Sequence, residues 1–347
     1  MGAGRIATHH PLTMKLLKEL KLEKDLVPLS NVPLSLEELK FFDSEEDALC
    51  YLTKLARSAI KKIPKKYLTG MSFMKVCRLF FSKKLKKIQE AIHVSGYDTE
   101  FEVGNGWIMC HAIIDMYKPD LKFASIKGGL SRIIDGLIEK LQKKKNVKIH
   151  PDHCVYGWNK QLDGKWRIQW KSKKEKDIHI TLSHNLHIST GISSWEYWFR
   201  NQTIQDVPVN ILDSIEHINK VSLCRIYTTY ENTDWISVIK KCATKTPLRY
   251  IIPITKDTVM ISYLDGEKAD ELSTLSDDDM KDWVVKGTAL AFPGLSRFIP
   301  EPSEIKRGYW KVGVHLWKPA KHFVPPSGFK CSDDTFSFSG EAFSQFH

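Results

Sequence analysis

Three short glycine segments carry the residue types that could hold a nucleotide or another phosphate ligand. They are Gly2-Ala3-Gly4-Arg5, the pair Gly128-Gly129, and Gly340-Glu341-Ala342 close to the last residue. Glycine lets the backbone approach a ligand closely, and a helix that starts nearby offers unpaired N–H groups to a phosphate. Taken singly, none of the three is a dinucleotide fingerprint, because the G-x-G at residues 2–4 lacks a third glycine and a preceding strand.

Other common catalytic patterns are absent from the sequence. The 13 His residues show no HExxH spacing and no repeated His/Cys cluster, so we expect no metal site. There is neither a G-x-S-x-G elbow, which would indicate a serine hydrolase, nor a Walker A motif. The seven Cys residues are scattered and never form C-x-x-C. This pattern favours free thiols in a reducing compartment, so we expect a cytoplasmic protein.

The charge balance is basic. Lys and Arg number 52 against 41 Asp and Glu, which gives a formal net charge of +11. The excess is found in short runs at residues 61–66, 83–87, 143–145 and 171–176. Such runs could bind nucleic acid or an anionic surface, but they are dispersed and lack interleaved aromatic residues, which is more typical of solvated faces and helix C-termini. No apolar run approaches the ~20 residues that span a bilayer, so we expect no membrane partner.

Hydrophobic periodicity divides the chain into a helical first third and a strand-rich remainder. A period of 3.6 residues predicts helices over residues 11–22, 44–63, 73–92, 107–117, 130–141 and 278–292. Ser44 with Asp47 is typical of a helix start, and Pro64 is expected to stop that helix. A hairpin is predicted to turn at Asp163-Gly164. Further strands are expected over residues 146–149, 178–182, 185–190, 222–230, 249–254, 259–264, 308–317 and from Phe336. This mixture favours a two-lobed protein of the α/β (mixed α+β) class.

The order of these segments resembles the flavin-containing amine oxidoreductases, the monoamine-oxidase-like family, and is most similar to the versions of large DNA viruses. The likeness extends over nearly the whole chain. It is most specific at the Gly128-Gly129 helix, the hairpin over 248–266 and Gly340-Glu341-Ala342. The resemblance implies a protein of the host cytoplasm or the virion if it is viral.

The resemblance also implies a two-lobed FAD-dependent fold. Residues 1–10, 125–195 and 296–347 would form a remnant FAD-binding lobe. Residues 11–124 would give the helical part and residues 196–295 the β-sheet part of a substrate lobe. The first dinucleotide-binding βαβ unit, with its G-x-G-x-x-G turn, is missing from this sequence. We therefore expect a chain truncated at both ends.

Individual residues acquire roles from the same resemblance. The residues that would contact the cofactor are Gly2, Ala3, Gly4 and Arg5 at the flavin, Val147 at the adenine, Thr190 and Gly191 along the cofactor, and Gly340 and Glu341 at the ribityl and phosphate region. Trp310 and Trp317 are candidates for the aromatic wall of a substrate cage, although a core or hairpin role is the commoner one. Arg225 and Arg249 could meet a substrate carboxylate, against the simpler interpretation of ion pairing or exposure to solvent.

The implied activity is the oxidation of a small amine, with hydride transfer to FAD and O2 as the electron acceptor. Because the glycine fingerprint is absent, FAD binding and activity themselves are open at this point. The alternative is a non-catalytic relative that serves as a basic binding or structural protein.

Overall fold

The computed structural model describes residues 5–29, 34–118, 122–205, 207, 209–320 and 333–340. The chain divides into two compact units, residues 1–134 with 219–323 and residues 135–218 with 324–347. The two units are defined by compactness, whereas the predicted cofactor and substrate lobes are defined by the molecules that they would bind. The division into units therefore does not test the predicted lobes. In the described part of the chain, no helix is both long and apolar enough to cross a bilayer.

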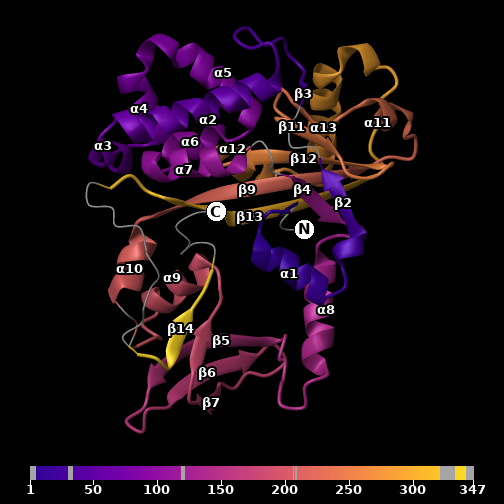
Figure 1. The fold of residues 1–347 in the computed structure, drawn as a ribbon. Coiled ribbons are helices and arrows are strands. Elements are labelled where there is room, and N and C mark those ends of the chain that lie inside the picture. Colours follow the sequence, from indigo (N-terminus) through magenta and orange to yellow (C-terminus); the bar gives the residue numbers. More distant parts are fainter. Residues whose placement is uncertain are drawn as a thin grey trace. The chain divides into compact units, whose positions relative to one another are not determined.

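The first unit contains a helical layer packed around one core (Figure 1). Its helices are α2 (Glu45–Lys62), α3 (Lys65–Gly70), α4 (Phe73–Phe80), α5 (Leu85–Ser95), α6 (Asp98–Val103) and α7 (Gly106–Met116). The predicted start of α2 is confirmed, because the Ser44 hydroxyl accepts a hydrogen bond from the Asp47 N–H at 3.1 Å. The helix ends before Pro64, as expected.

The single helix predicted over residues 73–92 is wrong. A 3-10 turn over Ser82–Lys84 separates α4 from α5. The turn places both Phe81 and Leu85 against the same helical core. Packing of these two side chains therefore outweighs the continuous helical period of the sequence.

A six-stranded sheet lies beside the helical layer in the same unit (Figure 1). Its order is β13 (Glu304–Trp317), β9 (Ile218–Thr229), β12 (Thr258–Asp265), β11 (Tyr250–Pro253), β10 (Cys242–Ala243) and β3 (Leu34–Ser35). The strands predicted near 222–230, 249–254, 259–264 and 308–317 are confirmed, and so is the predicted helix near 278–292, which is α13 (Asp277–Ala291). Helix α12 (Glu267–Thr274) and helix α11 (Asp234–Val238) complete this region.

Strand β12 contains an irregularity that matters for the site. Ile261 pairs with Ile226 and Leu264 pairs with Cys224, so two residues of β12 oppose the single residue Arg225. This extra residue makes a β-bulge, which re-aims side chains locally. Tyr263 lies in the bulge with a φ of 58°, a conformation that is uncommon for a residue other than glycine.

A small sheet holds the start of the described chain. Strand β4 (Phe123–Ile126) lies between β1 (Ile6–Ala7) and β2 (Leu26–Leu29), and helix α1 (Pro11–Glu19) packs nearby. The predicted helix after Gly128-Gly129 is confirmed as α8 (Ser131–Gln142). Both glycines have positive φ values of 85° and 94°, as a tight turn requires.

The second unit is built on two further sheets. Strands β5 (His153–Lys160), β6 (Trp166–Ser172) and β7 (His179–Ser183) are antiparallel, and the predicted turn at Asp163-Gly164 is confirmed. Strands β8 (Leu186–Ile188) and β14 (Phe336–Phe338) form a parallel pair. Helices α9 (Ile192–Arg200) and α10 (Val209–Glu216) belong to the same unit.

The strand predicted over residues 146–149 is wrong. This segment is irregular, and the Val147 N–H donates to the Lys144 carbonyl at 3.1 Å in a turn that follows α8. The surrounding residues Lys143, Lys145 and Lys148 are exposed. A stretch with so little apolar surface to bury gains little from joining a sheet.

Candidate functional site

The parallel strands β8 and β14 bring together residues that are about 150 positions apart. Phe336 pairs with Leu186 and Phe338 with Ile188, and the Ser339 N–H extends the ladder to the Ile188 carbonyl at 2.9 Å. The two strands therefore end at the same place, with Thr190 after one and Gly340 after the other. Open parallel sheets bind ligands beyond the carboxyl ends of their strands. The structure thus brings Thr190, Gly191 and Gly340 of the predicted cofactor contacts to one such edge.

The start of helix α9 offers unpaired polar groups at this edge. Gly191 is its N-cap, and among the described residues no side chain caps the first N–H groups. The Thr190 hydroxyl is buried and has no hydrogen-bond partner among the described residues. A Cβ placed on Gly191 would meet no atom of the described residues within 4 Å, so the chain leaves room beside this backbone position. These groups fit the polar chain of a nucleotide cofactor.

The other predicted cofactor contacts are not gathered here. Val147 lies in the turn after α8. Gly2, Ala3, Gly4 and Glu341 lie outside the described residues. Their roles, like those of the residues that the structure does bring together, stay predictions.

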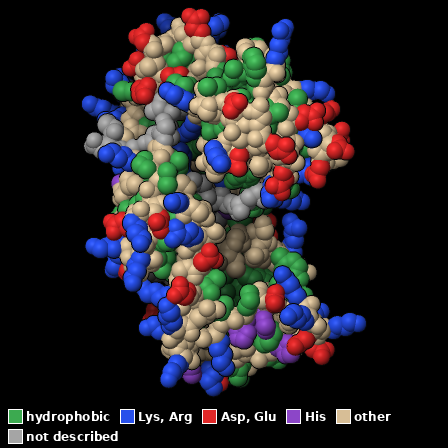
Figure 2. Space-filling model, turned by 90° about the vertical axis from the view of Figure 1, so that its right-hand side faces the viewer, with side chains coloured by type: hydrophobic (Ala, Val, Ile, Leu, Met, Phe, Trp, Pro, Cys, Tyr) green, Lys and Arg blue, Asp and Glu red, His purple; other side chains and the backbone are tan. Residues whose placement is uncertain are grey.

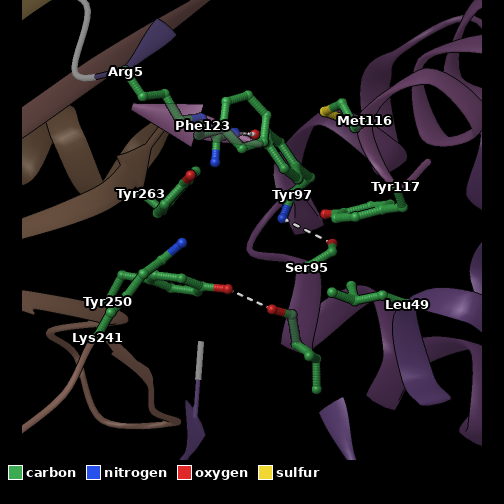
Figure 3. Close-up of a pocket in the computed structure, with 11 residues that line it drawn as sticks. Arg5, Leu49, Ser95, Tyr97, Met116, Tyr117, Phe123, Lys241, Tyr250 and Tyr263 are labelled. Atoms are coloured by element: carbon green, nitrogen blue, oxygen red, sulfur yellow. Dashed lines mark hydrogen bonds between the residues drawn. The ribbon is translucent and has the colours of Figure 1, made fainter. Parts of the chain in front are cut away.

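Arg5 lines a cavity in the first unit, which we call the Arg5 pocket. Its guanidinium stacks on the Phe123 ring, with 4.2 Å from Cζ to the ring centroid. The same group donates a hydrogen bond to the Tyr97 hydroxyl at 2.7 Å. The pocket holds about 20 Å³, and its wall is drawn in Figure 3. A space of this size takes one compact polar group, because about 10–15 Å³ is already enough for a water molecule.

Four of the lining residues are tyrosines, and we call them the tyrosine cage: Tyr97, Tyr117, Tyr250 and Tyr263. The rings of Tyr250 and Tyr263 are 4.6 Å apart, and those of Tyr97 and Tyr263 are 5.5 Å apart, edge to face. Such offset ring pairs are favourable. Burial raises the pKa of Tyr97, Tyr117 and Tyr250, so these phenols stay neutral at neutral pH.

Sequence reasoning missed the tyrosine cage. Tyr97 lies at the start of α6 and Tyr117 at the end of α7, whereas Tyr250 lies on β11 and Tyr263 in the β12 bulge. These elements are far apart in the sequence, and only the fold brings the four side chains together. Two of them, Tyr250 and Tyr263, do lie in the hairpin over 248–266 that carries the family resemblance. The sequence signal for these two residues was a single tyrosine in each of two largely aliphatic strands, a polar hydroxyl where an apolar side chain is expected.

Lys241 gives the Arg5 pocket a second cation. It lies just before β10, and its side chain lines the same cavity (Figure 3). Burial lowers the pKa of Lys241 from 10.5 to about 8, and the positive charge of Arg5 contributes to the same shift. The pocket therefore combines two positive charges with neutral phenols.

Replacing Tyr250 by Phe should lower the free energy of unfolding by about 1–2 kcal/mol. The Tyr250 hydroxyl donates a hydrogen bond to the Val94 carbonyl, and the ring packs against Gly96, whose added Cβ would lie 3.0 Å from it. Denaturant unfolding measures the loss. Tyr67→Phe is the matched control, because Tyr67 is 43% exposed and should change nothing. Equal losses of stability in the Tyr250→Phe and Tyr67→Phe variants would show that the hydrogen bond of Tyr250 does not stabilise the fold.

The two predicted cage tryptophans lie on β13 and do not line the Arg5 pocket. Trp317 is buried, at 4% exposure, and its carbonyl accepts a hydrogen bond from the Asn105 N–H at 2.8 Å. Trp310 is half-buried. A contact of either residue with a substrate remains a prediction.

Arg249 has partners within the protein. Its guanidinium forms an ion pair with Asp98 and donates to the His93 carbonyl at 3.1 Å. The simpler interpretation, ion pairing, therefore holds for Arg249. Its φ of 63° is a strained conformation for an arginine, and strain of this kind is often found near functional sites.

Figure 2 shows how charged side chains are distributed on one face of the protein. Lys and Arg side chains are scattered over it, with Asp and Glu side chains between them. Binding of nucleic acid or of an anionic surface therefore stays a prediction.

Comparisons with known proteins give a fold but no sequence family. No protein-family model matches the chain, and no curated protein matches its sequence. Putrescine oxidase with putrescine bound matches with a TM-score of 0.69 and 11% identity, covering 99% of this chain and 84% of its own. A protoporphyrinogen oxidase-like protein from Exiguobacterium matches with a TM-score of 0.60 and 10% identity, covering 99% and 83%. The chain therefore has the mixed α/β fold of the FAD-dependent amine oxidases.

Proposed function

We propose that this protein is a flavin-dependent amine oxidoreductase that takes FAD as cofactor, a small amine as substrate and O2 as electron acceptor. The observation that carries the proposal is the likeness in fold to putrescine oxidase over almost the whole chain. The meeting of Thr190, Gly191 and Gly340 at one sheet edge supports it, because the resemblance in sequence independently implies that these residues contact the cofactor. The six described cysteines are free thiols, which suits the proposed cytoplasmic location.

The residues at the β8 and β14 edge would hold the cofactor. The Thr190 hydroxyl and the first N–H groups of α9 would donate to its polar chain, and the Gly340 backbone would lie against it. When bound, a flavin supplies an acceptor for the hydride from the carbon next to the amine. The protein's own part is to orient the two molecules and to set the charge around them.

Loss of a hydride requires the neutral amine, whose lone pair stabilises the cation left behind. Surroundings of low polarity would favour that form, because burial disfavours the ammonium and lowers its pKa.

Purified protein incubated with FAD and freed of excess cofactor should show the flavin absorbance bands. Thr190→Val should weaken FAD binding about tenfold, since a charge-assisted hydrogen bond to a ligand is worth about 1.5 kcal/mol. The same change should leave the stability of the cofactor-free protein equal or slightly higher, because it removes a buried hydroxyl without a partner. Fluorescence titration of FAD measures the affinity.

Ser193→Ala is the matched control, because Ser193 is an exposed hydroxyl on the same first turn of α9. It should bind FAD as the original chain does. A preparation that stays colourless after FAD is added would overturn the proposal. In that case salt-sensitive retention on heparin would favour the non-catalytic, basic binding protein.

A further inference from the structure

The positive charge of this protein is concentrated in the helical layer of the first unit. Residues 48–89, which run from α2 into α5, contain 12 Lys and Arg residues and no Asp or Glu. This segment alone therefore carries a formal charge of +12, against +11 for the whole chain, so all other residues together are close to neutral. Among the described residues, only Arg78 of these 12 forms an ion pair, with Glu102. Most of the charge is therefore left for an external partner.

Most lysines of this segment are not placed to stabilise helix ends. A cation is favourable at the C-terminus of a helix and unfavourable at its N-terminus. Lys61 and Lys62 meet this rule in the last turn of α2. Lys65 and Lys66 instead begin α3, and the run over 83–87 lies in the 3-10 turn and the first turn of α5. Within this segment, the interpretation of the basic runs as helix C-termini therefore holds only for Lys61 and Lys62.

The fold joins two of the basic runs around exposed aromatic rings. Helices α3 and α4 lie next to each other in the helical layer (Figure 1). The rings of Tyr67 on α3 and Phe80 on α4 are 5.9 Å apart, and the two residues are 43% and 45% exposed. The run over 61–66 ends just before Tyr67, and the run over 83–87 begins shortly after Phe80. The folded chain thus has the two features that the sequence lacks, clustered basic runs and aromatic residues among them.

We propose that this surface, which we call the basic face and which comprises residues 61–67, Phe80 and residues 83–87, binds single-stranded nucleic acid. Lysine ammonium groups are point charges that suit the phosphates of a strand and carry no sequence preference. Exposed aromatic rings stack on bases, and they reach the bases only where these are unpaired. This binding would be a function separate from the proposed oxidation and needs no flavin.

An anionic membrane would attract the same charge, but the apolar side of α4 is not free to enter it. A helix that lies in a membrane interface places its apolar face among the lipids. In α4 that face packs into the helical core, where Phe73, Met74, Val76 and Cys77 are all buried. Leu79 is the one aliphatic side chain of α4 that is exposed. The basic face therefore favours nucleic acid over a lipid surface.

Fluorescence anisotropy of a labelled oligothymidylate of about 20 nucleotides, titrated with the full chain in the absence of flavin, tests the proposal. Saturable binding is expected. Affinity should fall about 50-fold between roughly 50 and 200 mM salt if about four phosphates are contacted. A combined variant that neutralises four lysines of the basic face should bind about tenfold more weakly or worse. Its changes are Lys62→Gln, Lys66→Gln, Lys83→Gln and Lys84→Gln.

The matched control removes the same amount of charge from the second unit. Its changes are Lys144→Gln, Lys145→Gln, Lys173→Gln and Lys174→Gln, all at exposed positions of the two other basic runs. The control should bind the oligonucleotide as the original chain does. Equal losses in the two combined variants would show that total charge, and not the basic face, holds the strand, and would overturn the proposal.

Stacking is tested by Phe80→Ala, which should bind the oligonucleotide about tenfold more weakly. Its affinity for heparin, a polyanion without bases, should be unchanged. Leu79→Ala is the control, because Leu79 is an exposed apolar neighbour without a ring and should change neither affinity. An unchanged oligonucleotide affinity of Phe80→Ala, or an equal loss of affinity for heparin, would contradict base stacking and overturn the proposal.

Vesicles of phosphatidylserine and phosphatidylcholine distinguish nucleic acid from a membrane. Tighter binding to the vesicles than to the oligonucleotide, or no saturable binding of the oligonucleotide, would overturn the proposal. All substituted side chains are exposed, so thermal unfolding of each variant should match that of the original chain. Because these titrations contain no flavin, their failure would leave the FAD proposal standing, and a protein unable to bind FAD would leave the basic face standing.

Discussion

Replacing Trp158 by Ala should lower the free energy of unfolding of the second unit by about 3–5 kcal/mol. Trp158 is 1% exposed, and its ring lies 4.7 Å from that of Trp198 and 5.8 Å from that of Trp195. Removing it leaves a cavity between three aromatic rings, since Phe336 of β14 also packs on it at 6.4 Å. Circular dichroism during denaturant unfolding measures the loss.

The effect should extend to the candidate cofactor edge. Phe336 begins β14, which is followed two residues later by Gly340, so loosening its contact with Trp158 weakens the β8 and β14 pair. FAD affinity should fall together with stability. Trp170→Ala is the matched control: it removes a half-buried tryptophan of β6 whose Nε1 donates to the Thr181 hydroxyl at 2.9 Å. It should cost less than half as much, and losses of equal size would contradict the packing argument.

The sequence predicts the regular elements well where burial repeats with a fixed period. Helix α2 has apolar residues on one face together with a capping Ser44 and a terminating Pro64, and its bounds are predicted almost to the residue. The hairpin at Asp163-Gly164 is equally clear, because Gly164 takes the positive φ of 82° that a tight turn needs. These signals are local, so they survive in a single sequence.

The errors arise where a contact distant in sequence decides the local structure. The helical period over 73–92 is unbroken in the sequence, yet packing of Phe81 and Leu85 on one core bends the chain between them. Helix α9 was not predicted, although its Trp195 and Trp198 are buried three positions apart. Both pack against Trp158, which is about forty residues away in the sequence. The contact that stabilises this helix is therefore not visible in its own segment of the sequence.

The residues of the candidate sites also differ in whether the sequence alone could identify them. Thr190, Gly191 and Gly340 could be named because the order of segments resembles a known family, and the parallel pairing of β8 with β14 brings them together. The tyrosine cage could not be named. Tyr263 faces the cavity from a β-bulge, and a one-residue irregularity of this kind reverses the expected face of every later side chain in the strand.

A buried carboxyl pair is likewise invisible in the sequence, because its two members are far apart in the chain. Glu100 on α6 is 6% exposed, and its Oε2 has no hydrogen-bond partner among the described residues. Burial raises the pKa of Glu100 well above 4.5, and the charge of Asp265 raises it further. Burial also raises the pKa of Asp265 from 3.8 to about 6, although Arg249 and Arg225 oppose the rise.

The carboxyl pair should therefore contribute a stabilisation that decreases as the pH rises, whereas His93, whose pKa burial lowers from 6.5 to about 4, contributes in the opposite direction. Both carboxyl groups hold protons more tightly in the folded state than in the unfolded one, so unfolding releases protons and the free energy of unfolding falls with pH. The stabilisation is complete below about pH 4 and is lost as the pH rises through about 6, with Glu100 extending the loss to higher pH. The rise of the Asp265 pKa from 3.8 to about 6 corresponds to roughly 3 kcal/mol.

Glu100→Gln should remove much of this dependence, because a neutral amide replaces a carboxyl group that resists ionisation and the charge next to Asp265 disappears. Urea unfolding at pH 5 and pH 8 should show that the variant gains more stability over the original chain at pH 8 than at pH 5. Glu102→Gln is the matched control on the same helix, since Glu102 is 44% exposed and pairs with Arg78 at the surface. An unchanged pH dependence in the Glu100 variant would show that the carboxyl pair does not hold its protons in the folded protein.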